Sequence, residues 1–337
     1  MKILLSSHAF FPNIGGIESV SELLAAEFTR RGHEVVVVTR TPGPDETRRP
    51  FRVLRRPGGR ALLGAVRWCD VFFHNNISLQ TLWPLLWVRR PWVVAHQTWI
   101  ARLDGRLDWH DRLKRFLLRF AAANVAISRA VAASLPVPCV LIPNPFRDDL
   151  FCRMPGVERS GGVVFLGRLV SDKGADLLLR ALRLLKGEGL VPRLTVIGDG
   201  PEAGALRELA RELGVAEQVD FAGPRGGLEL ARMLNAHRVL AVPSRWAEPF
   251  GVVALEGIAC GCGVVGSREG GLADAIGPCG ITFPNGDVPA LAAALREALT
   301  RPDLAAQWEA AAPAHLAAHT ARAVADAYLE VFEKSTR

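Results

Sequence analysis

The sequence lacks any apolar run that approaches the 18 or more residues of a membrane-spanning helix. Its nearest approach is residues 82–88, which Arg89 ends. The apolar start at residues 1–5 turns polar at Ser6, so it is too short for the core of a secretory signal. We therefore expect a cytoplasmic protein that has no spanning helix.

Cysteine is also scarce. The six cysteines include no Cys-x-x-Cys pair and no spacing typical of a disulfide framework. Cys260 and Cys262 are close enough to suggest a metal site, but small buried thiols are far more common than such sites. We therefore expect neither a disulfide scaffold nor a cysteine-bound metal.

What the sequence does contain is typical of a globular protein: 337 residues, of which 49% are hydrophobic and 22% charged. At about 100–200 residues per domain, this length favours two domains. The formal net charge of +7 fits acidic ligands or an anionic surface, although many arginines will lie on solvated faces. No nucleic-acid-binding module, low-complexity segment or solenoid repeat is recognisable.

Short apolar runs alternate with amphipathic stretches along the chain, a pattern typical of α/β domains with parallel sheets. The predicted strands are residues 3–7, 34–40, 71–74, 92–96, 125–128 and 139–143 in the first half, and 163–166, 194–197, 219–222, 239–242, 263–265 and 280–283 in the second. The predicted helices are residues 17–31, 175–185, 203–213, 228–235, 252–259 and 290–299, with almost continuous helix over 302–337.

A proline-rich, strand-poor connection at residues 143–155 indicates the domain boundary. We predict one domain at residues 1–148, a second at 149–315 and a C-terminal helix at 316–337. Because ligands of open α/β sheets bind at the carboxyl ends of strands, candidate residues are sought in the loops there.

Two loops that follow predicted strands could hold phosphate. Residues 12–16 contain Gly15 and Gly16, which permit close backbone approach, although a tight strand-to-helix turn is the commoner use of such glycines. Residues 167–174 contain Arg168 and Lys173, which can meet a diphosphate as a fork and a point charge. The alternative for the second loop is a solvated basic turn.

Two weaker signals also lie at strand ends. Residues 198–204 have the spacing G-x-G-x-x-x-G, with Pro201 at the helix start, and this favours a turn facing the ligand over a nicotinamide site. His74 and His96 end apolar strands, where a lone histidine is more often a hydrogen-bonded core or rim residue. Of these two, His96 is the better placed to reach a ligand.

The most specific pattern is Glu248 and Glu256, separated by seven residues, with Pro-Phe-Gly after the first. Pro249 suits the first turn of a helix because its missing N–H would have no partner there. We therefore expect Glu248 just before a helix and Glu256 about two turns into it. Carboxylates accept bonds from sugar hydroxyls and a helix N-terminus favours phosphate. Chance occurrence on an exposed helix is the alternative.

Together these motifs resemble the retaining glycosyltransferases of family 4, which use nucleotide-sugar donors. Their GT-B fold has two Rossmann-like parallel-sheet domains facing a central cleft, with a C-terminal helix that crosses back to the first domain. The resemblance rests on Gly15-Gly16, Gly167-Arg168-Leu169 with Lys173-Gly174, the turn at 198–201, and Glu248-Pro249-Phe250-Gly251 followed by Glu256. One departure is Pro143-Asn144-Pro145 in place of the usual Asn-Gly after the hinge strand.

The resemblance implies roles for the matching residues. Arg168 and Lys173 would bind the donor diphosphate and stabilise charge on the leaving group. Glu248 would contact the transferred sugar, Glu256 would bind the ribose hydroxyls, and His96 would lie near the donor sugar. The remaining donor-binding residues implied are Gly15, Gly16, Gly198, Phe250, Gly251 and Val252.

The implied function is retaining transfer of a sugar to a glycan or lipid-linked acceptor in cell-surface polysaccharide or glycolipid synthesis. A UDP- or GDP-sugar would be the donor. We expect no resident cofactor and no metal requirement, because the chain has no Asp-x-Asp motif. The alternatives are a GT-B epimerase or phosphorylase, and a non-catalytic relative that binds nucleotide or glycan.

Residues 107–122 combine Trp109, Phe116 and Phe120 with four basic side chains. A basic amphipathic helix with aromatic residues can lie on an anionic bilayer, which would make the protein peripheral on the inner face of the cell membrane. The alternative is an ordinary helix that packs its apolar stripe on the sheet.

Overall fold

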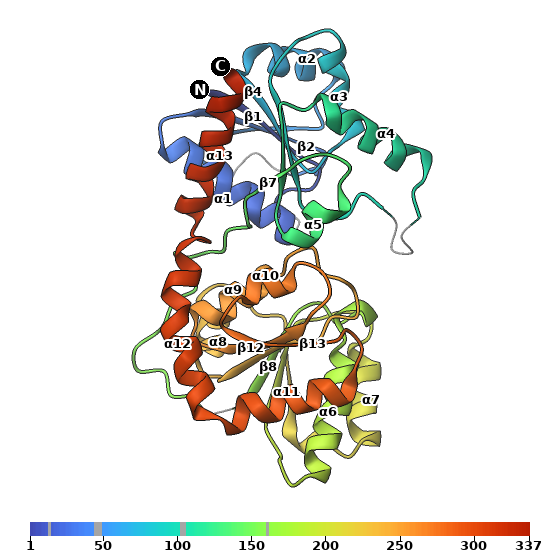
Figure 1. Cartoon of the computed structure of the whole chain (residues 1–337), viewed down its shortest axis with the longest axis vertical. Helices are drawn as coiled ribbons and strands as arrows, with labels where there is room; N and C mark the ends of the chain where they lie inside the picture. The colour runs from blue at the N-terminus through green and yellow to red at the C-terminus, as the bar shows by residue number, and fades with distance from the viewer. Residues whose placement is uncertain (13–14, 44–48, 102–105, 160–161) are drawn as a thin grey trace. The chain divides into compact units, whose positions relative to one another are not determined.

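The computed structural model of the chain describes residues 1–12, 15–43, 49–101, 106–159 and 162–337. These residues divide into two compact units, Met1–Pro145 with His319–Arg337 and Phe146–Ala318 (Figure 1). Each unit contains one sheet in which every strand pair is parallel. The predicted α/β class with two parallel-sheet domains is therefore confirmed.

Within the described residues, the first unit has a seven-stranded sheet of order β3-β2-β1-β4-β5-β6-β7. Its strands are β1 (Lys2–Ser7), β2 (Glu34–Thr39), β3 (Arg52–Arg55), β4 (Val71–Asn75), β5 (Trp92–His96), β6 (Ala123–Ala126) and β7 (Val140–Leu141). Its helices are α1 (Gly16–Arg30), α2 (Gly59–Trp68), α3 (Leu79–Leu82), η1 (Trp83–Leu86), α4 (Trp109–Leu117), η2 (Leu118–Phe120), α5 (Arg129–Ser134) and α13 (Ala321–Thr336).

Alternate residues of β1 point to opposite faces of this sheet, as strand geometry requires. Ile3 and Leu5 pack in one core cluster with α1 and α13, whereas Leu4 packs in another with α2. Both clusters exclude water, which is why the middle residues of the central strands are apolar.

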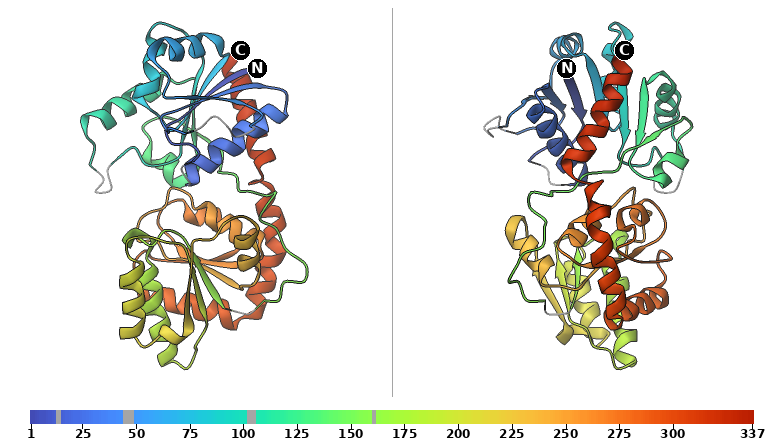
Figure 2. Two further views of the ribbon diagram at one scale, coloured as in Figure 1. Left: turned by 180° about the vertical axis from the view of Figure 1, so that it is seen from behind. Right: turned by 60° about the vertical axis from the view of Figure 1, so that its left-hand side comes forward.

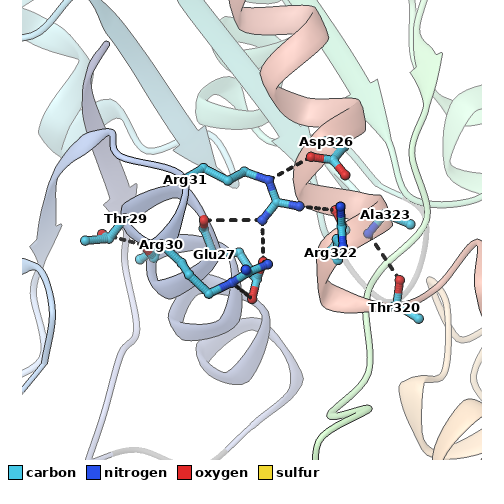
Figure 3. A network of polar contacts seen from close by, with 9 residues as sticks. Glu27, Thr29, Arg30, Arg31, Thr320, Arg322, Ala323 and Asp326 are labelled. Atoms are coloured by element: carbon cyan, nitrogen blue, oxygen red, sulfur yellow. Dashed lines mark hydrogen bonds and ion pairs between the residues drawn. The ribbon is translucent and has the colours of Figure 1, made fainter.

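Helix α13 lies beside α1 in the first unit (Figure 2). The rings of Phe28 and Phe332 meet edge to face with centroids 5.5 Å apart. At the end of α1, the Arg31 guanidinium donates to the Asp326 carboxylate at 2.7 Å and to the carbonyl of Arg322 at 3.0 Å (Figure 3). The last residues of the chain thus complete the core of the first unit.

The second unit has a six-stranded sheet of order β10-β9-β8-β11-β12-β13 in the described part of the chain. Its strands are β8 (Val163–Leu166), β9 (Leu194–Ile197), β10 (Val219–Gly223), β11 (Val239–Val242), β12 (Gly263–Ser267) and β13 (Gly280–Phe283). Its helices are η3 (Ser171–Lys173), α6 (Ala175–Gly187), α7 (Ala203–Glu212), η4 (Ala216–Gln218), α8 (Gly227–Asn235), α9 (Val252–Ala259), α10 (Leu272–Ile276), α11 (Val288–Thr300) and α12 (Pro302–Ala317). Helices α6, α7 and α11 cover one face, and α8, α9 and α10 cover the other (Figure 1).

The almost continuous helix expected over residues 302–337 is present, with one interruption where α12 ends at Ala317 and α13 begins at Ala321. Thr320 caps the new helix, since its hydroxyl accepts the backbone N–H of Ala323 at 3.1 Å. Strand β3 was missing from the predicted strands because it is a four-residue edge strand with an arginine at each end.

Candidate functional site

The chemistry-bearing loops of the second unit follow β8, β9, β11 and β12. Strand β8 lies between β9 and β11, so successive strands are added on one side of β8 and then on the other. Such a reversal leaves a crevice at the carboxyl ends of the strands, where open α/β sheets bind ligands. We call this end of the second sheet its carboxyl edge.

Two glycines let neighbouring loops of the carboxyl edge approach each other closely. Gly198 has φ of +140°, and a Cβ there would lie 1.9 Å from the carbonyl oxygen of Gly167. Gly174 has φ of +69°, and its Cβ would lie 2.0 Å from the carbonyl oxygen of Pro243. Both positions require glycine to join the β8 loop to the loops on either side.

The structure brings together two of the predicted site residues, Lys173 and Glu248. The Lys173 ammonium donates to Glu248 Oε1 at 2.5 Å, and the Ser244 hydroxyl donates to the same oxygen at 2.7 Å. Glu248 is 8% exposed and Ser244 is fully buried. A cation and a carboxylate that lie 75 residues apart in sequence are thus paired beside the point where the strand order reverses.

Arg168 lies in the same β8 loop, one residue after Gly167, and is exposed. Its guanidinium makes no hydrogen bond or ion pair with the residues that the structure describes. Unlike Lys173, it can therefore meet an anion without first leaving a partner in the protein.

A second ion pair braces the loops around Lys173. The Arg245 guanidinium donates to both carboxylate oxygens of Asp176 at 2.6 Å and to the carbonyl of Ser171 at 2.9 Å. The Arg245 N–H also donates to the carbonyl of Asp172 at 2.9 Å. Sequence reasoning missed Ser244, Arg245 and Asp176 as site-forming residues. The sequence signal for two of them was the polar pair Ser244-Arg245, which follows the apolar strand β11 after Pro243.

The expectation that Pro249 opens a helix is wrong. Helix α9 begins at Val252, and its N-cap Gly251 has φ of +105°, which an α-helix cannot contain. Phe250 just before it is buried, at 2% exposure. Glu256 is therefore the fifth residue of α9, little more than one turn from its start instead of about two.

Glu256 is half-buried, and burial raises the pKa of its carboxyl to about 7, while the positive charge of Arg147 acts in the opposite direction. No described residue forms a hydrogen bond with its side chain, and none links it to Lys173 or Glu248. A carboxyl group that titrates near neutrality without a partner is typical of functional sites.

The remaining candidates belong to the first unit. Gly15 is the N-cap of α1 and Gly16 is its first residue, while Asn13 and Ile14 of the same motif lie outside the described residues. Gly15 has an extended φ of −171°, which any residue adopts. A Cβ at Gly16 would meet no described atom within 4 Å. The described protein therefore gives no packing reason for glycine at position 16.

His96 is fully buried at the end of β5, and its Nε2 lies 3.1 Å from Asn124 Oδ1. Since that amide oxygen can only accept, Nε2 carries the proton and Nδ1 is an acceptor. Nδ1 has no partner among the described residues. Burial lowers the pKa of His96 to about 4, against the effect of Asn124, so the imidazole is neutral near pH 7.

His74 has a different environment. It is fully buried, and its ring meets Phe72 edge to face at 4.4 Å and Trp92 at 5.8 Å. Burial lowers its pKa to about 3, and neither ring nitrogen has a partner in the described chain. Aromatic packing makes His74 a core residue, in agreement with its lower ranking as a candidate.

Two further polar residues at the same strand ends were not selected from the sequence. Asn75 ends β4, and its amide nitrogen donates to Ser21 Oγ at 2.7 Å, whereas its buried amide oxygen lacks a partner in the described part. Gln97 follows β5 and is 4% exposed, with neither side-chain atom hydrogen-bonded to a described residue. Buried polar groups without partners are costly, so a ligand group or an ordered water is expected to satisfy these atoms.

The α4–η2 segment, residues 109–120, carries its aromatic residues on the outside. Trp109 is 67% exposed, Phe116 47% and Phe120 65%. Only Leu117 and Leu118 of this segment join the core cluster beneath it. The three aromatic side chains therefore do not pack on the sheet, whereas Leu117 and Leu118 do. No helix in the described part of the chain has the length and apolarity to cross a bilayer.

Two family models match consecutive parts of the chain. The model described as "Glycosyltransferase Family 4" matches residues 14–146, and "Glycosyl transferases group 1" matches residues 157–315. The chain is 30% identical over 348 residues to the GDP-mannose-dependent alpha-(1-6)-phosphatidylinositol monomannoside mannosyltransferase of Mycolicibacterium smegmatis, and the match covers 90% of this chain and 91% of that protein.

A second relative matches over a shorter length. The chain is 36% identical over 184 residues to the D-inositol 3-phosphate glycosyltransferase of Saccharomonospora viridis, which covers 51% of this chain and 42% of that protein. The chain thus spans less than half the length of that relative, and of several others with the same name.

Solved structures share the fold at lower identity. Anabaena HepE in complex with UDP and glucose superposes with a TM-score of 0.79 at 21% identity, covering 99% of both chains. WaaG, a glycosyltransferase of lipopolysaccharide biosynthesis, superposes with a TM-score of 0.71 at 18% identity over 98% of this chain and 99% of that one. At these identities the likeness establishes the fold alone.

Proposed function

The chain belongs to the group 1, family 4 glycosyltransferases, and on this premise we propose that it transfers a sugar, with retention, from a UDP- or GDP-sugar to a glycan or lipid-linked acceptor. The acceptor would belong to cell-surface polysaccharide or glycolipid synthesis. The resemblance found in the motifs and the expected GT-B fold are both confirmed.

The observation that carries the proposal is the cluster of Lys173, Glu248 and Ser244 at the carboxyl edge, beside the exposed Arg168. Arg168 would bind the donor diphosphate first, because its guanidinium has no partner among the described residues to leave. A phosphate oxygen would then compete with Glu248 for the Lys173 ammonium. The released carboxylate oxygen would accept from a hydroxyl of the transferred sugar, still oriented by Ser244.

In this arrangement the two cations stabilise the charge that develops on the diphosphate as the bond to the sugar breaks. Charge stabilisation by preorganised groups is usually the largest single contribution to such a step. The cations take the part that a metal has in other transferases, so we propose that the reaction needs no metal. Gly198, Phe250, Gly251 and Val252 complete the proposed donor-binding residues in the second unit.

Glu256 is the proposed ligand of the ribose hydroxyls. Only its ionised form accepts from both hydroxyls, and burial holds its pKa at about 7. Donor binding would therefore release a proton at pH values below about 7. This coupling is a measurable property of the assignment, and it does not depend on which sugar is transferred.

In the first unit we propose that neutral groups bind hydroxyls. His96 Nδ1, the Asn75 amide oxygen and the Gln97 amide are buried acceptors and donors without partners in the described residues. A sugar hydroxyl can satisfy each of them at no cost in charge burial. Gly15 and Gly16 at the start of α1 are proposed to lie against phosphate.

The choice among donors and acceptors rests on the relatives. The mannosyltransferase that aligns with 90% of the chain is named for GDP-mannose and for a phosphatidylinositol mannoside. We therefore propose a GDP-sugar ahead of a UDP-sugar and a glycolipid as the acceptor. The α4–η2 segment would hold the protein at an anionic bilayer that contains this acceptor, on the inner face of the cell membrane.

The test is nucleotide release from UDP-, GDP- and ADP-sugars, measured with and without EDTA. We expect release from one donor class, unaffected by EDTA and lowered about 10²- to 10³-fold in Lys173→Gln. A non-catalytic relative would bind nucleotide and release none. A phosphorylase would require added phosphate, and an epimerase would return a sugar with altered stereochemistry, so each alternative has its own result.

A further inference from the structure

A cavity of about 460 Å³ lies at the opposite edge of the second sheet, where β11 and β12 begin. Its walls come from the last residues of α9 and α11 and the first turns of α12. Trp308 and Leu299 contribute apolar side chains to its lining, and Gly261 and Gly263 also line it. We call it the amino-edge cavity; none of the proposed donor-binding residues lines it.

Arginines converge on this cavity. Arg159, Arg238 and Arg301 line it, while Glu309 is the one acidic residue among its described lining. A fourth arginine, Arg153, is adjacent. One guanidinium nitrogen of Arg153 and one of Arg159 each lie 2.3 Å from the point where a Cβ on Gly261 would stand. The guanidinium groups of Arg153 and Arg159 therefore converge beside Gly261.

Little negative charge offsets this convergence. Arg153 pairs with Glu309 at 3.2 Å, but the two side chains are 51% and 71% exposed, so water screens the pair. Arg301 is occupied by Glu297 and Asp303.

The two remaining lining arginines, Arg159 and Arg238, form no ion pair with an acidic side chain among the described residues. Arg238 is exposed, and its guanidinium makes no hydrogen bond or ion pair with a described residue. Arg159 donates to the carbonyl of Cys260 at 2.9 Å, and burial together with the charges of Arg153 and Arg238 lowers its pKa. An anion between them would relieve this repulsion.

The start of α12 adds a second attraction for an anion. The helix runs 16 residues from Pro302, and its N-cap Arg301 supplies no side-chain hydrogen bond to the first turn. Pro302 and Ala305 both line the cavity. The dipole of a long helix favours an anion at this end, where the Asp303 carboxylate already accepts from the backbone N–H groups of Asp303 and Leu304.

We propose that the amino-edge cavity binds the phosphate or diphosphate group of a water-soluble ligand, held chiefly by Arg159 and Arg238. Arginine matches phosphate geometry through paired N–H donors. The ligand is soluble because no large apolar side chain is exposed in the described lining, whereas a lipid headgroup site would need such side chains to enter the bilayer. This binding is separate from the proposed donor site at the carboxyl edge.

The test uses inorganic pyrophosphate as the probe on the full chain, with binding measured by calorimetry and located by hydrogen exchange. We expect slower exchange in residues 258–263 and 301–312, the two segments that contribute most of the cavity lining. Pyrophosphate at the Arg168 loop would be detected separately, through residues 167–174. Absence of protection in the first two segments would overturn the proposal.

The informative variant is Arg159→Gln with Arg238→Gln, in which affinity at this site should fall roughly 10²-fold because two charge-assisted contacts are lost. Arg238→Gln alone breaks no contact with a described residue and should weaken binding about tenfold without altering thermal stability. The matched control is Arg180→Gln with Arg183→Gln, two exposed arginines of α6.

Equal affinity in the double variant and the control would overturn the proposal. Anionic vesicles give the remaining arm: if they bind through Arg159 and Arg238 and pyrophosphate does not, a lipid headgroup replaces the soluble ligand and the proposal is wrong as stated.

Discussion

The carboxyl edges of the two sheets are built from opposite kinds of polar group. In the first unit, His96, Asn75 and Gln97 are neutral, buried and without partners for part of their polar atoms in the described chain. In the second unit, Lys173 with Glu248 and Arg245 with Asp176 are charged and paired. The same strand-end position therefore holds neutral groups suited to hydroxyls in one unit and charged groups suited to anions in the other.

The difference follows from solvation. A buried charge needs a partner, whereas a buried neutral group needs only a hydrogen bond, which a ligand hydroxyl can supply. The first unit places its charge elsewhere, on the outer surface of α4, beside exposed aromatic residues. Substitutions in each unit can test this contrast.

The largest effect is expected from removing a cation of the second unit. Arg168→Ala and Lys173→Ala should each lower turnover by about 10²–10³, the range found when one preorganised charge-stabilising group is lost. Initial rates of nucleotide release measure this. Arg183→Ala on α6 is the matched control, since it removes an exposed arginine of the same unit and should not change the rate.

EDTA separates this assignment from a metal site. Rates should be the same with and without the chelator, because the two cations act on the diphosphate directly. If EDTA stopped the reaction and manganese restored it, the roles given to Arg168 and Lys173 would be wrong.

A smaller effect is expected at Glu256. Glu256→Gln should weaken nucleotide binding roughly 10- to 100-fold, the value of a hydrogen bond to a charged group. In the wild type, affinity should rise with pH through about 7, because burial sets the pKa near this value and only the ionised carboxylate binds both hydroxyls. Calorimetry at several pH values should show proton release that the variant lacks; unchanged affinity in a folded variant would exclude Glu256 from the ribose site.

The raised pKa of Glu256 also predicts that stability of the fold falls with rising pH, whereas nucleotide affinity rises. Burial raises the pKa of Glu256 in the folded state from its ordinary value of 4.5 to about 7, so the carboxyl destabilises the fold progressively as pH rises across this window. Glu256→Gln should therefore be more stable than the wild type at pH 8 by about 1–3 kcal/mol. The difference should vanish near pH 4.5. Denaturant unfolding at the two pH values measures it, and equal stability at pH 8 would contradict the raised pKa.

In the first unit, His96→Ala should lower turnover about tenfold, the value of one neutral hydrogen bond. Nucleotide affinity should not change. The pH–rate profile should also keep its shape between pH 5.5 and 8, because burial lowers the pKa of His96 to about 4. His74→Leu is the control, since His74 packs among aromatic rings, and it should leave the rate unchanged. Loss of an acidic limb in the His96 variant would show that the imidazole acts in its charged form.

The fold was largely predictable because buried parallel strands are continuous apolar runs, and local sequence reveals such runs directly. Every strand except β3 has a predicted counterpart, and in β3 an arginine at each end hides the apolar pattern. Short helices were less predictable, since α2, α3 and α5 have no predicted counterpart. Helix α9 matches the predicted range 252–259, whereas the expected start at Pro249 fails because Gly251 has φ of +105°.

The site divides in the same way. Arg168, Lys173, Glu248 and Glu256 belong to short motifs, so their presence in loops and helix starts could be predicted. Their partners could not, because the contacts join residues far apart in sequence. Arg245 and Asp176 are 69 residues apart, and no local pattern specifies that pair. The missing partners of Asn75 and Gln97 likewise depend on the whole fold.

The smallest effect concerns the charge that the first unit places outside. Membrane binding through the α4–η2 segment should place Trp109, Phe116 and Phe120 in the interface while Arg112, Lys114, Arg115 and Arg119 meet anionic headgroups. Each basic residue near such a surface contributes about 1 kcal/mol, and salt screens it within a Debye length of about 10 Å at 0.1 M. Arg112 is the informative residue, because it is exposed and its guanidinium makes no hydrogen bond or ion pair with a described residue. Arg112→Gln should therefore weaken binding to anionic vesicles about fivefold without affecting the fold.

Co-sedimentation of the protein with vesicles should also require anionic lipid and fall steeply as salt is raised. Arg211→Gln on α7 of the second unit, a surface arginine paired with Glu208, should bind as the wild type does. If the wild type fails to sediment, or if Arg112→Gln and Arg211→Gln sediment equally, the exposed aromatic residues have another partner and the bilayer is not the surface that α4 binds.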